Sequence, residues 1–175
     1  MPTNKKQVKD ETGPTASRPS IADYGIPKSK TGLLAWADIT KRLSDTKYYW
    51  ICTVDSKNHP HVTPVDGLWV DDTLYFSGSP RTRRNRNLIT NPNVSVHLES
   101  GLDVVILHGE AQEQPALDSA LASRLAKEHG NKYGYGFTAE NFITGGVGLY
   151  IFRPRTAFAW SQFPKDATRW DFQGH

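Results

Sequence analysis

The chain has 175 residues, of which 37% are hydrophobic and 22% charged, a composition typical of a globular protein with its own core. No apolar run approaches the roughly 20 residues of a membrane-spanning helix, and the first thirty residues lack the apolar stretch of a signal peptide. The net charge is only +3, and a single cysteine, Cys52, excludes an internal disulfide framework and cysteine-clustered zinc sites. We therefore expect a cytoplasmic, single-domain protein that does not associate with membranes.

The chain begins with a polar segment, residues 1–30, which is rich in Lys, Thr, Ser and Pro and has few apolar residues. We expect this segment to be a flexible arm or to lie over a neighbouring surface, and residues 31–175 to form the domain. A helix is predicted over residues 34–44, because apolar side chains recur there at steps of three and four.

The middle of the chain has the aromatic and β-branched runs of antiparallel strands, which we predict over residues 48–54, 61–70 and 73–77. Only Asp71 and Asp72 separate the last two strands, so they form a tight hairpin. Pro60 and Pro64 place the start of the second strand at a sheet edge or a bulge, because proline cannot donate to a strand partner.

Helices and strands alternate over the rest of the chain. We predict helices over residues 80–90 and 115–128, the second ending at Gly130, and a loop over 133–146. Further strands are predicted over residues 94–99, 104–112, 148–152 and 156–160, followed by a tail over 167–172. Six or seven short antiparallel strands with a few helices between them indicate a mainly β protein whose sheet closes, fully or partly, into a barrel.

The segment Ser77–Asn87 carries the strongest local charge. No Asp or Glu occurs from Thr73 to Leu98, whereas four arginines lie inside that window: Arg81, Arg83, Arg84 and Arg86. Cations are unfavourable at a helix N-terminus, by about 0.3–1 kcal/mol each, unless an anion is bound there. A phosphate could accept hydrogen bonds from nearby hydroxyls, from free backbone N–H groups and from guanidinium groups.

Two other interpretations of this segment remain open. It could be a solvated basic face, or it could follow the phosphate backbone of a nucleic acid. The patch is short and the rest of the chain is not basic, which favours a small phosphorylated ligand over a nucleic acid.

Gly67 lies within a predicted strand. A glycine there either lets a flat ligand approach the backbone or marks a bulge that turns a barrel corner.

Several motifs in a consistent order resemble the pyridoxamine-5′-phosphate-oxidase-like, FMN-binding split-barrel superfamily, which includes flavin/deazaflavin oxidoreductases. The similar residues are Tyr49-Trp50, Pro60–Val65, Trp69, Leu74–Ser77, Thr82–Arg84, Arg86–Leu88, Asn91-Pro92, His97–Gly101 and Ala167–Trp170. The resemblance covers most of residues 20–172.

The resemblance implies a homodimer of split barrels with a cofactor, FMN or alternatively F420, in each groove between the subunits. It also implies that one strand contacts the cofactor ring, that one turn binds the cofactor phosphate, and that residues between them contact the rest of the cofactor. The cofactor-binding residues expected from it are Thr63, Pro64, Val65, Asp66, Gly67, Leu68, Phe76, Ser77, Thr82, Arg83, Arg84 and Asn87.

The chain departs from the vitamin B6 oxidases of this superfamily. Those enzymes have basic residues where this chain has Thr63 and Leu68, and a lysine where it has Arg84. Their C-terminal substrate-binding arginines are not recognisable here either. We therefore do not expect the chain to oxidise pyridoxamine phosphate.

The function predicted is hydride transfer between the bound cofactor and a small organic substrate, with the protein orienting the cofactor and excluding water. Trp69 and Trp160 are expected to wall the substrate side, no catalytic side chain is singled out, and no metal site is expected. Two alternatives are a non-catalytic protein that stores, senses or sequesters a flavin or haem, and a nucleic-acid binder whose affinity falls steeply with salt.

Overall fold

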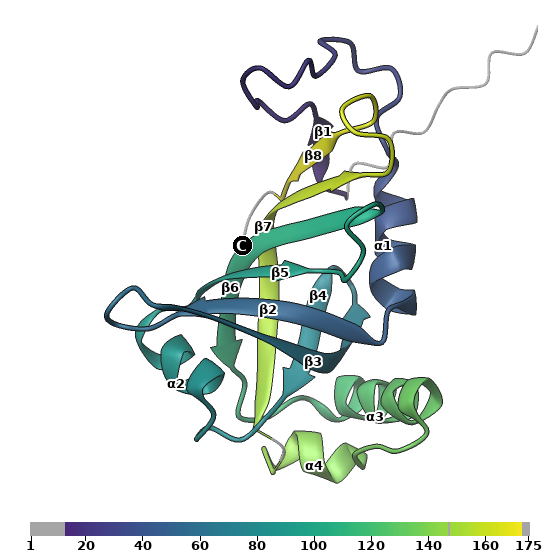
Figure 1. The fold of residues 1–175 in the computed structure, drawn as a ribbon. Coiled ribbons are helices and arrows are strands. Elements are labelled where there is room, and N and C mark those ends of the chain that lie inside the picture. Colours follow the sequence, from purple (N-terminus) through teal and green to yellow (C-terminus); the bar gives the residue numbers. More distant parts are fainter. Residues whose placement is uncertain (1–12, 147, 173–175) are drawn as a thin grey trace, which may run out of the picture.

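A six-stranded antiparallel barrel forms the body of the protein in this computed structural model, which describes residues 13–146 and 148–172 (Figure 1). The strands are β1 (Thr15–Ser17), β2 (Tyr48–Val54), β3 (Pro60–Val70), β4 (Thr73–Ser77), β5 (Asn93–His97), β6 (Val104–Glu113), β7 (Leu149–Trp160) and β8 (Thr168–Asp171). The helices are α1 (Trp36–Asp45), α2 (Arg83–Thr90), α3 (Ser119–Tyr133) and α4 (Ala139–Ile143).

The strand order is β1-β8-β7-β4-β3-β2-β5-β6, and β6 also pairs with β7. This last pairing closes six strands into a ring, and β8 and β1 extend the sheet beyond β7. The predicted mainly β fold with an antiparallel barrel of six to seven strands is confirmed. Alternating residues point into the ring, so that Ile51, Val96, Leu107 and Phe152 are fully buried.

The hairpin between β3 and β4 has the predicted tight turn. Asp71 and Asp72 both have positive φ angles, of 50° and 55°, as a two-residue hairpin turn requires. β3 pairs with β2 over Pro60–Asp66 and with β4 over Gly67–Val70. The first half of β3 therefore has one strand neighbour among the described residues, which explains how it accommodates Pro60 and Pro64.

The two strands predicted over 148–152 and 156–160 are one continuous strand, β7. The pairing with β6 shifts register between His108 and Gly109, so that Arg155 is an extra residue on β7. A Cβ atom on Gly109 would lie 2.0 Å from the Arg153 carbonyl oxygen, so only glycine fits at this bulge. The sequence Arg153-Pro154-Arg155 suggests the end of a strand, but the bulge lets β7 continue through these residues.

The helix predicted over 34–44 is confirmed as α1, which buries Ile39 and Leu43. The predicted start of the helix at Pro80 is wrong by three residues, because Thr82 caps α2 at Arg83. The predicted stop at Gly130 is also wrong. α3 continues to Tyr133, and Gly134 ends it in the left-handed conformation with φ 74°.

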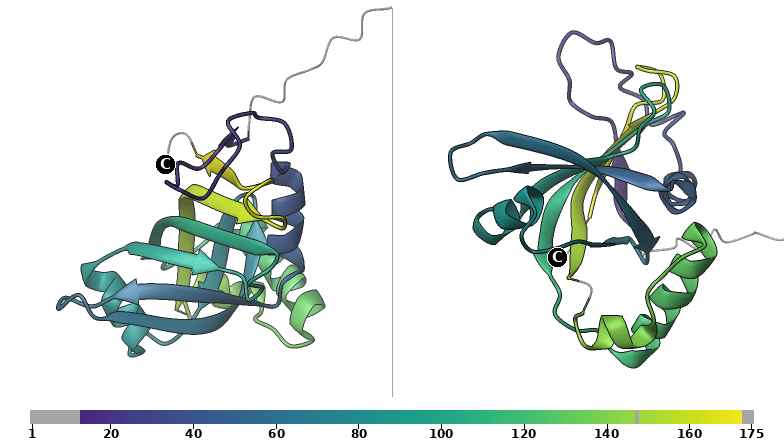
Figure 2. Two further views of the ribbon diagram at one scale, coloured as in Figure 1. Left: turned by 45° about the horizontal axis from the view of Figure 1, so that its top comes forward. Right: turned by 60° about the horizontal axis from the view of Figure 1, so that its bottom comes forward.

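The segment predicted as a loop over 133–146 contains the short helix α4, which lies with α3 at one end of the barrel (Figure 2). These two helices bury a second apolar cluster against β3, β4 and β7. Its buried members are Leu68, Val70, Ala122, Leu125, Phe142 and Leu149.

Part of the segment expected to be an N-terminal arm lies against the barrel. β1 pairs with β8, which brings part of the expected arm into the sheet. The guanidinium of Arg18 donates to the carbonyl oxygens of Ser29 and Thr31 on one side and of Lys165 and Ala167 on the other. Residues 13–30 are therefore fastened to the barrel, while residues 1–12 lie outside the described part. Among the described residues, no helix is long and apolar enough to cross a membrane.

Candidate functional site

The arginine-rich turn between β4 and α2 places its guanidinium groups in different surroundings. Thr82 caps α2 by accepting from the Asn85 N–H at 3.3 Å. Arg83 is exposed and lies 3.5 Å from the Asp55 carboxylate. Hydrogen bonds to Asp55, above all from the His59 backbone N–H, lower its pKa to about 2, so it is charged at neutral pH.

Arg84 points inward instead and is only 7% exposed. Its guanidinium donates to the Ser77 carbonyl oxygen at 3.2 Å and to the Asn85 side-chain oxygen at 3.0 Å, and it lies over the Phe76 ring. It forms no ion pair with a carboxylate of the described residues, and burial lowers its pKa. The site therefore contains a buried cation whose protein partners are neutral.

The remaining side chains of the turn support its backbone. The Asn85 amide donates to the carbonyl oxygens of Gly78 and Ser79, both at 3.0 Å. Asn87, expected to bind the cofactor, donates to the Thr53 hydroxyl inside the barrel at 3.0 Å. Within this structure Asn87 fastens α2 to β2.

The strand expected to contact the cofactor ring alternates between two environments. Val65 and Trp69 face the barrel core, and Leu68 faces α3 and α4. Thr63 and Asp66 are half-buried, and Pro64 is exposed. Because Pro60–Asp66 pairs with only one strand of the described part of the chain, its other edge leaves backbone groups for a ligand.

The Gly67 backbone is already occupied by the end of α3. Its N–H donates to the Tyr133 hydroxyl at 2.8 Å, and its carbonyl accepts from Lys132 at 3.1 Å and from Tyr133 at 2.9 Å. The Lys47 carbonyl oxygen lies 2.6 Å from the same Tyr133 hydroxyl, whose single hydrogen thus has two carbonyl acceptors, and Tyr133 bridges the point where β2 and β3 separate. Burial raises the pKa of Tyr133 to about 12 and lowers that of Lys132 to about 8.

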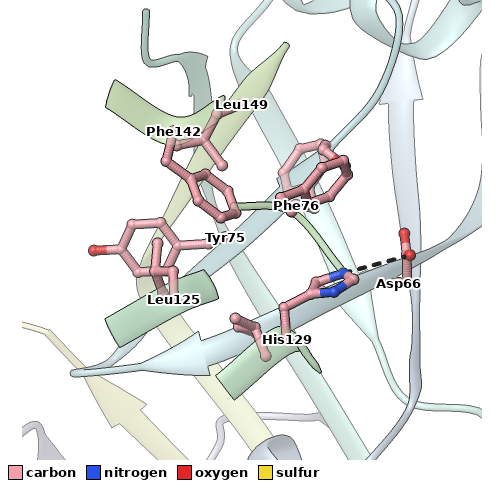
Figure 3. A pocket seen from close by; sticks show the side chains of 11 residues that line it. Asp66, Tyr75, Phe76, Leu125, His129, Phe142 and Leu149 are labelled. Atoms are coloured by element: carbon pink, nitrogen blue, oxygen red, sulfur yellow. Dashed lines mark ion pairs between the residues drawn. The ribbon is translucent and has the colours of Figure 1, made fainter. Parts of the chain in front are cut away.

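A small cavity lies between the turn, β3 and the two helices (Figure 3). Its volume is about 10 Å³, roughly the space of one water molecule. The residues that line it are Asp66, Gly67, Leu68, Tyr75, Phe76, Ser77, Leu125, His129, Phe137, Phe142 and Leu149. The cavity thus lies between the strand expected to contact the cofactor ring and the turn expected to bind the cofactor phosphate.

The structure does not bring Trp69 and Trp160 together within one chain. Trp69 is 5% exposed in the barrel core and pairs with Leu74. Trp160 is the last residue of β7, eight residues beyond Phe152, the β7 partner of Leu74. At roughly 3.3 Å per residue, that separation is about 26 Å along the strand.

Two polar side chains of the cavity form a pair that the sequence did not predict. His129 and Asp66 face each other there, 3.8 Å apart (Figure 3). No sequence motif marks His129, which lies 63 residues from Asp66. The described residues contain no group of three His, Cys, Asp or Glu side chains that could hold a metal ion.

Solved structures share this fold at low sequence identity. A conserved hypothetical protein of Mycobacterium tuberculosis, Rv2991, is 18% identical, with a TM-score of 0.58 over 77% of this chain and 89% of its own. The haem storage protein HutZ of Vibrio cholerae is 19% identical, with a TM-score of 0.53 over 67% and 88%. A protein named F420 reductase is 18% identical, with a TM-score of 0.50 over 70% and 96%.

Identities of this size show the shared fold alone. Among curated proteins, no significant match is found. The model of the family described as pyridoxamine 5′-phosphate oxidase, however, matches residues 36–160, which span the whole barrel ring. The chain therefore belongs to the pyridoxamine 5′-phosphate oxidase family.

Proposed function

We propose that this protein is an oxidoreductase that binds FMN or F420 and transfers hydride between the cofactor and a small organic substrate. When bound, the cofactor supplies the redox chemistry, and the protein binds it, orients it and excludes water. Membership of the family and the similarity to an F420 reductase support the cofactor class. The cytoplasmic location expected from the sequence stays a prediction.

The observation that carries the proposal is the buried guanidinium of Arg84. A cation with only neutral partners gains a strong charge-assisted interaction when a phosphate arrives beside it. Ser77, Thr82 and Arg83 lie around the same turn and offer further donors. Both FMN and F420 contain a phosphate group, so the residues present fit either cofactor.

The second support is the unpaired edge of β3. On this edge, the backbone groups of every second residue over Thr63–Asp66 are available to the polar edge of a planar ring, since the residues between them direct theirs to β2. The Gly67 N–H is not among them, because Tyr133 accepts it. We therefore place the ring edge along the half of the strand before Gly67.

We further propose that the protein acts as a homodimer through the outer face of the barrel sheet. One register row on that face runs Trp50, His97, Ile106, Phe158 and Arg169 across five strands. All five side chains are half-buried in a single copy of the described chain. A neighbouring groove of about 450 Å³, lined by Cys52, Ser95, His108 and others, gives a second copy a shaped surface.

Titration of the purified protein with FMN and with F420, followed by absorbance and fluorescence, tests the function. Arg84→Gln should weaken binding by about 10- to 100-fold, because it removes a charge-assisted contact. Arg86→Gln is the matched control, since Arg86 lies on the same helix and donates to the Arg81 carbonyl. Circular dichroism and a second variant, Ser77→Ala, separate loss of binding from loss of fold. Unchanged uptake of both cofactors by folded Arg84→Gln would refute the proposal.

A second candidate function is storage or sequestration of a flavin or haem without catalysis. The similarity to the haem storage protein HutZ favours testing it. It predicts ligand binding without turnover when reduced nicotinamide or reduced F420 is supplied with a panel of quinones and tetrapyrroles. Turnover with any of these acceptors would decide for the oxidoreductase.

A further inference from the structure

A second pocket, of about 200 Å³, lies on the outer face of the barrel over the neighbouring strands β6 and β7. The residues that line it are Glu110, Gln112, Ile151, Arg153 and Arg155, and none of them lines the cavity beside the arginine-rich turn. Since a water molecule takes about 30 Å³, the pocket has room for a molecule of roughly six to eight non-hydrogen atoms. It is too small for FMN or F420, so the ligand that fits it differs from the proposed cofactor.

The bulge in β7 brings two guanidinium groups to one carboxylate. Phe152 and Pro154 are buried, so Arg153 between them faces outward, where its register partner on β6 is Glu110. Arg155 is the extra residue of the bulge, and its guanidinium forms an ion pair with the same Glu110 carboxylate. Bulges commonly re-aim a side chain in this way. The wall of the pocket therefore has two positive charges and one negative charge.

Two polar side chains of this wall are free to bind a ligand. Arg153 is exposed and forms no ion pair or side-chain hydrogen bond within residues 13–146 and 148–172, and the same is true of the Gln112 amide. The ion pair between Arg155 and Glu110 is itself exposed, with 54% and 35% of the two side chains accessible. Exposed ion pairs contribute little to stability, so an anion can compete with Glu110 for a guanidinium.

We propose that this pocket binds a small carboxylic acid, with its carboxylate on Arg153 and its apolar part against Ile151. A guanidinium offers two parallel N–H groups that match the two oxygens of a carboxylate. The Gln112 amide can donate to, or accept from, a further polar group of the ligand. Arg153 is assigned the carboxylate because Arg155 is paired and also lines the neighbouring groove of about 450 Å³. This site is independent of the proposed oxidoreductase function.

The pocket and the proposed cofactor site lie on neighbouring strands. Ile151 pairs with Tyr75 on β4, which leads through Phe76 into Ser77 and the arginine-rich turn. Arg84, however, lies over the Phe76 ring, whereas the side chain of Ile151 lines the pocket on the outer face. The two sites should therefore be filled at the same time.

Calorimetric titration of the purified full-length chain with butyrate, at low ionic strength, tests the proposal. Butyrate should bind with a Kd of about 1 mM or tighter, whereas methyl butyrate, which has no charge, should not bind. Arg153→Gln should weaken binding at least about 10-fold, because it removes the charge-assisted contact. Glu110→Gln should strengthen it about 3- to 10-fold, because it removes the competing carboxylate. Lys127→Gln, which removes one positive charge from an exposed position of α3, should bind as wild type.

Backbone ¹H–¹⁵N spectra recorded during the titration locate the ligand and show that each variant is folded. Amide signals of Gln112, Ile151 and Arg153 should shift with the same midpoint as the heat. Absence of saturable binding, or wild-type affinity in folded Arg153→Gln, would overturn the site. Equally tight binding of inorganic phosphate without a shift at Ile151 would show a general cationic surface instead. Displacement of butyrate by FMN or F420 would likewise refute a separate site.

Discussion

The contacts of Arg84 and Gly67 depend on the residues next to them in the fold. Arg84 has room because Gly78 has no side chain; a Cβ there would lie 2.3 Å from the guanidinium. Gly67 brings β3 close to β4 and leaves its backbone to Lys132 and Tyr133. The missing side chains of Gly78 and Gly67 therefore leave space for contacts that other residues of the site make.

The substitution Gly67→Ala should destabilise the protein by about 1–3 kcal/mol, as overpacking of a well-packed site does. The added Cβ would lie 2.8 Å from the Tyr75 carbonyl oxygen and 3.0 Å from a Leu74 methyl group, and the carbonyl belongs to a paired strand that cannot move freely. Urea unfolding followed by circular dichroism measures the effect. Gly101→Ala is the control, because a Cβ there meets nothing within 4 Å, and it should change stability by less than about 0.5 kcal/mol. Equal stability of the two variants would contradict the close approach at Gly67.

At the scale of elements, side chains and short strands fasten the peripheral segments to the barrel. The end of α3 is joined to β3 through Lys132 and Tyr133, and Arg18 joins residues 29–31 to residues 165–167. β8 lies between β7 and β1, and both pairings are antiparallel. The segments outside the ring thus depend on a few specific hydrogen bonds.

Replacement of Arg18 by alanine should release the segment that contains β1. The variant loses four hydrogen bonds to carbonyl oxygens, at 2.6–2.9 Å, and should be less stable by about 1–3 kcal/mol. Hydrogen–deuterium exchange should accelerate in β1 and β8 and stay unchanged in β2 and β6. Lys28→Ala, an exposed neighbour, provides the comparison and should leave exchange unaltered. Wild-type exchange in the Arg18→Ala protein would show that β1 is held without it.

For the whole molecule, the proposed homodimer has a direct consequence for the cofactor. Phe158→Glu places a charge in the middle of the outer-face row and should convert the protein to a monomer, measured by light scattering after size exclusion. If the cofactor lies in a groove between subunits, its affinity should fall at least about 10-fold together with the loss of the dimer. Leu102→Glu, at an 81% exposed position between β5 and β6, should leave both unchanged. A Phe158→Glu protein that remains a dimer would exclude this face as the interface.

Local chemistry was enough to predict much of the fold from the sequence alone. The tight turn at Asp71-Asp72 and the edge or bulge at the start of β3 are predictable because each depends on residues close in sequence. The family resemblance and the barrel class followed from motif order and strand number. Boundaries failed where a distant partner decides them, as at Gly109, which lets β7 run on through Pro154, and at the end of α3, where Lys132 and Tyr133 bond to Gly67.

Only the tertiary structure decided which residues of the candidate site act together. The sequence determined that a cluster of arginines follows β4, but not that Arg84 turns inward while Arg83 meets Asp55. It also determined that Gly67, Asp66 and His129 are present, but not that Tyr133 occupies the Gly67 backbone or that His129 faces Asp66. The physical reason is that turns and caps are governed by neighbours along the chain. Burial and the pairing of charges depend on how strands and helices far apart in sequence pack in space.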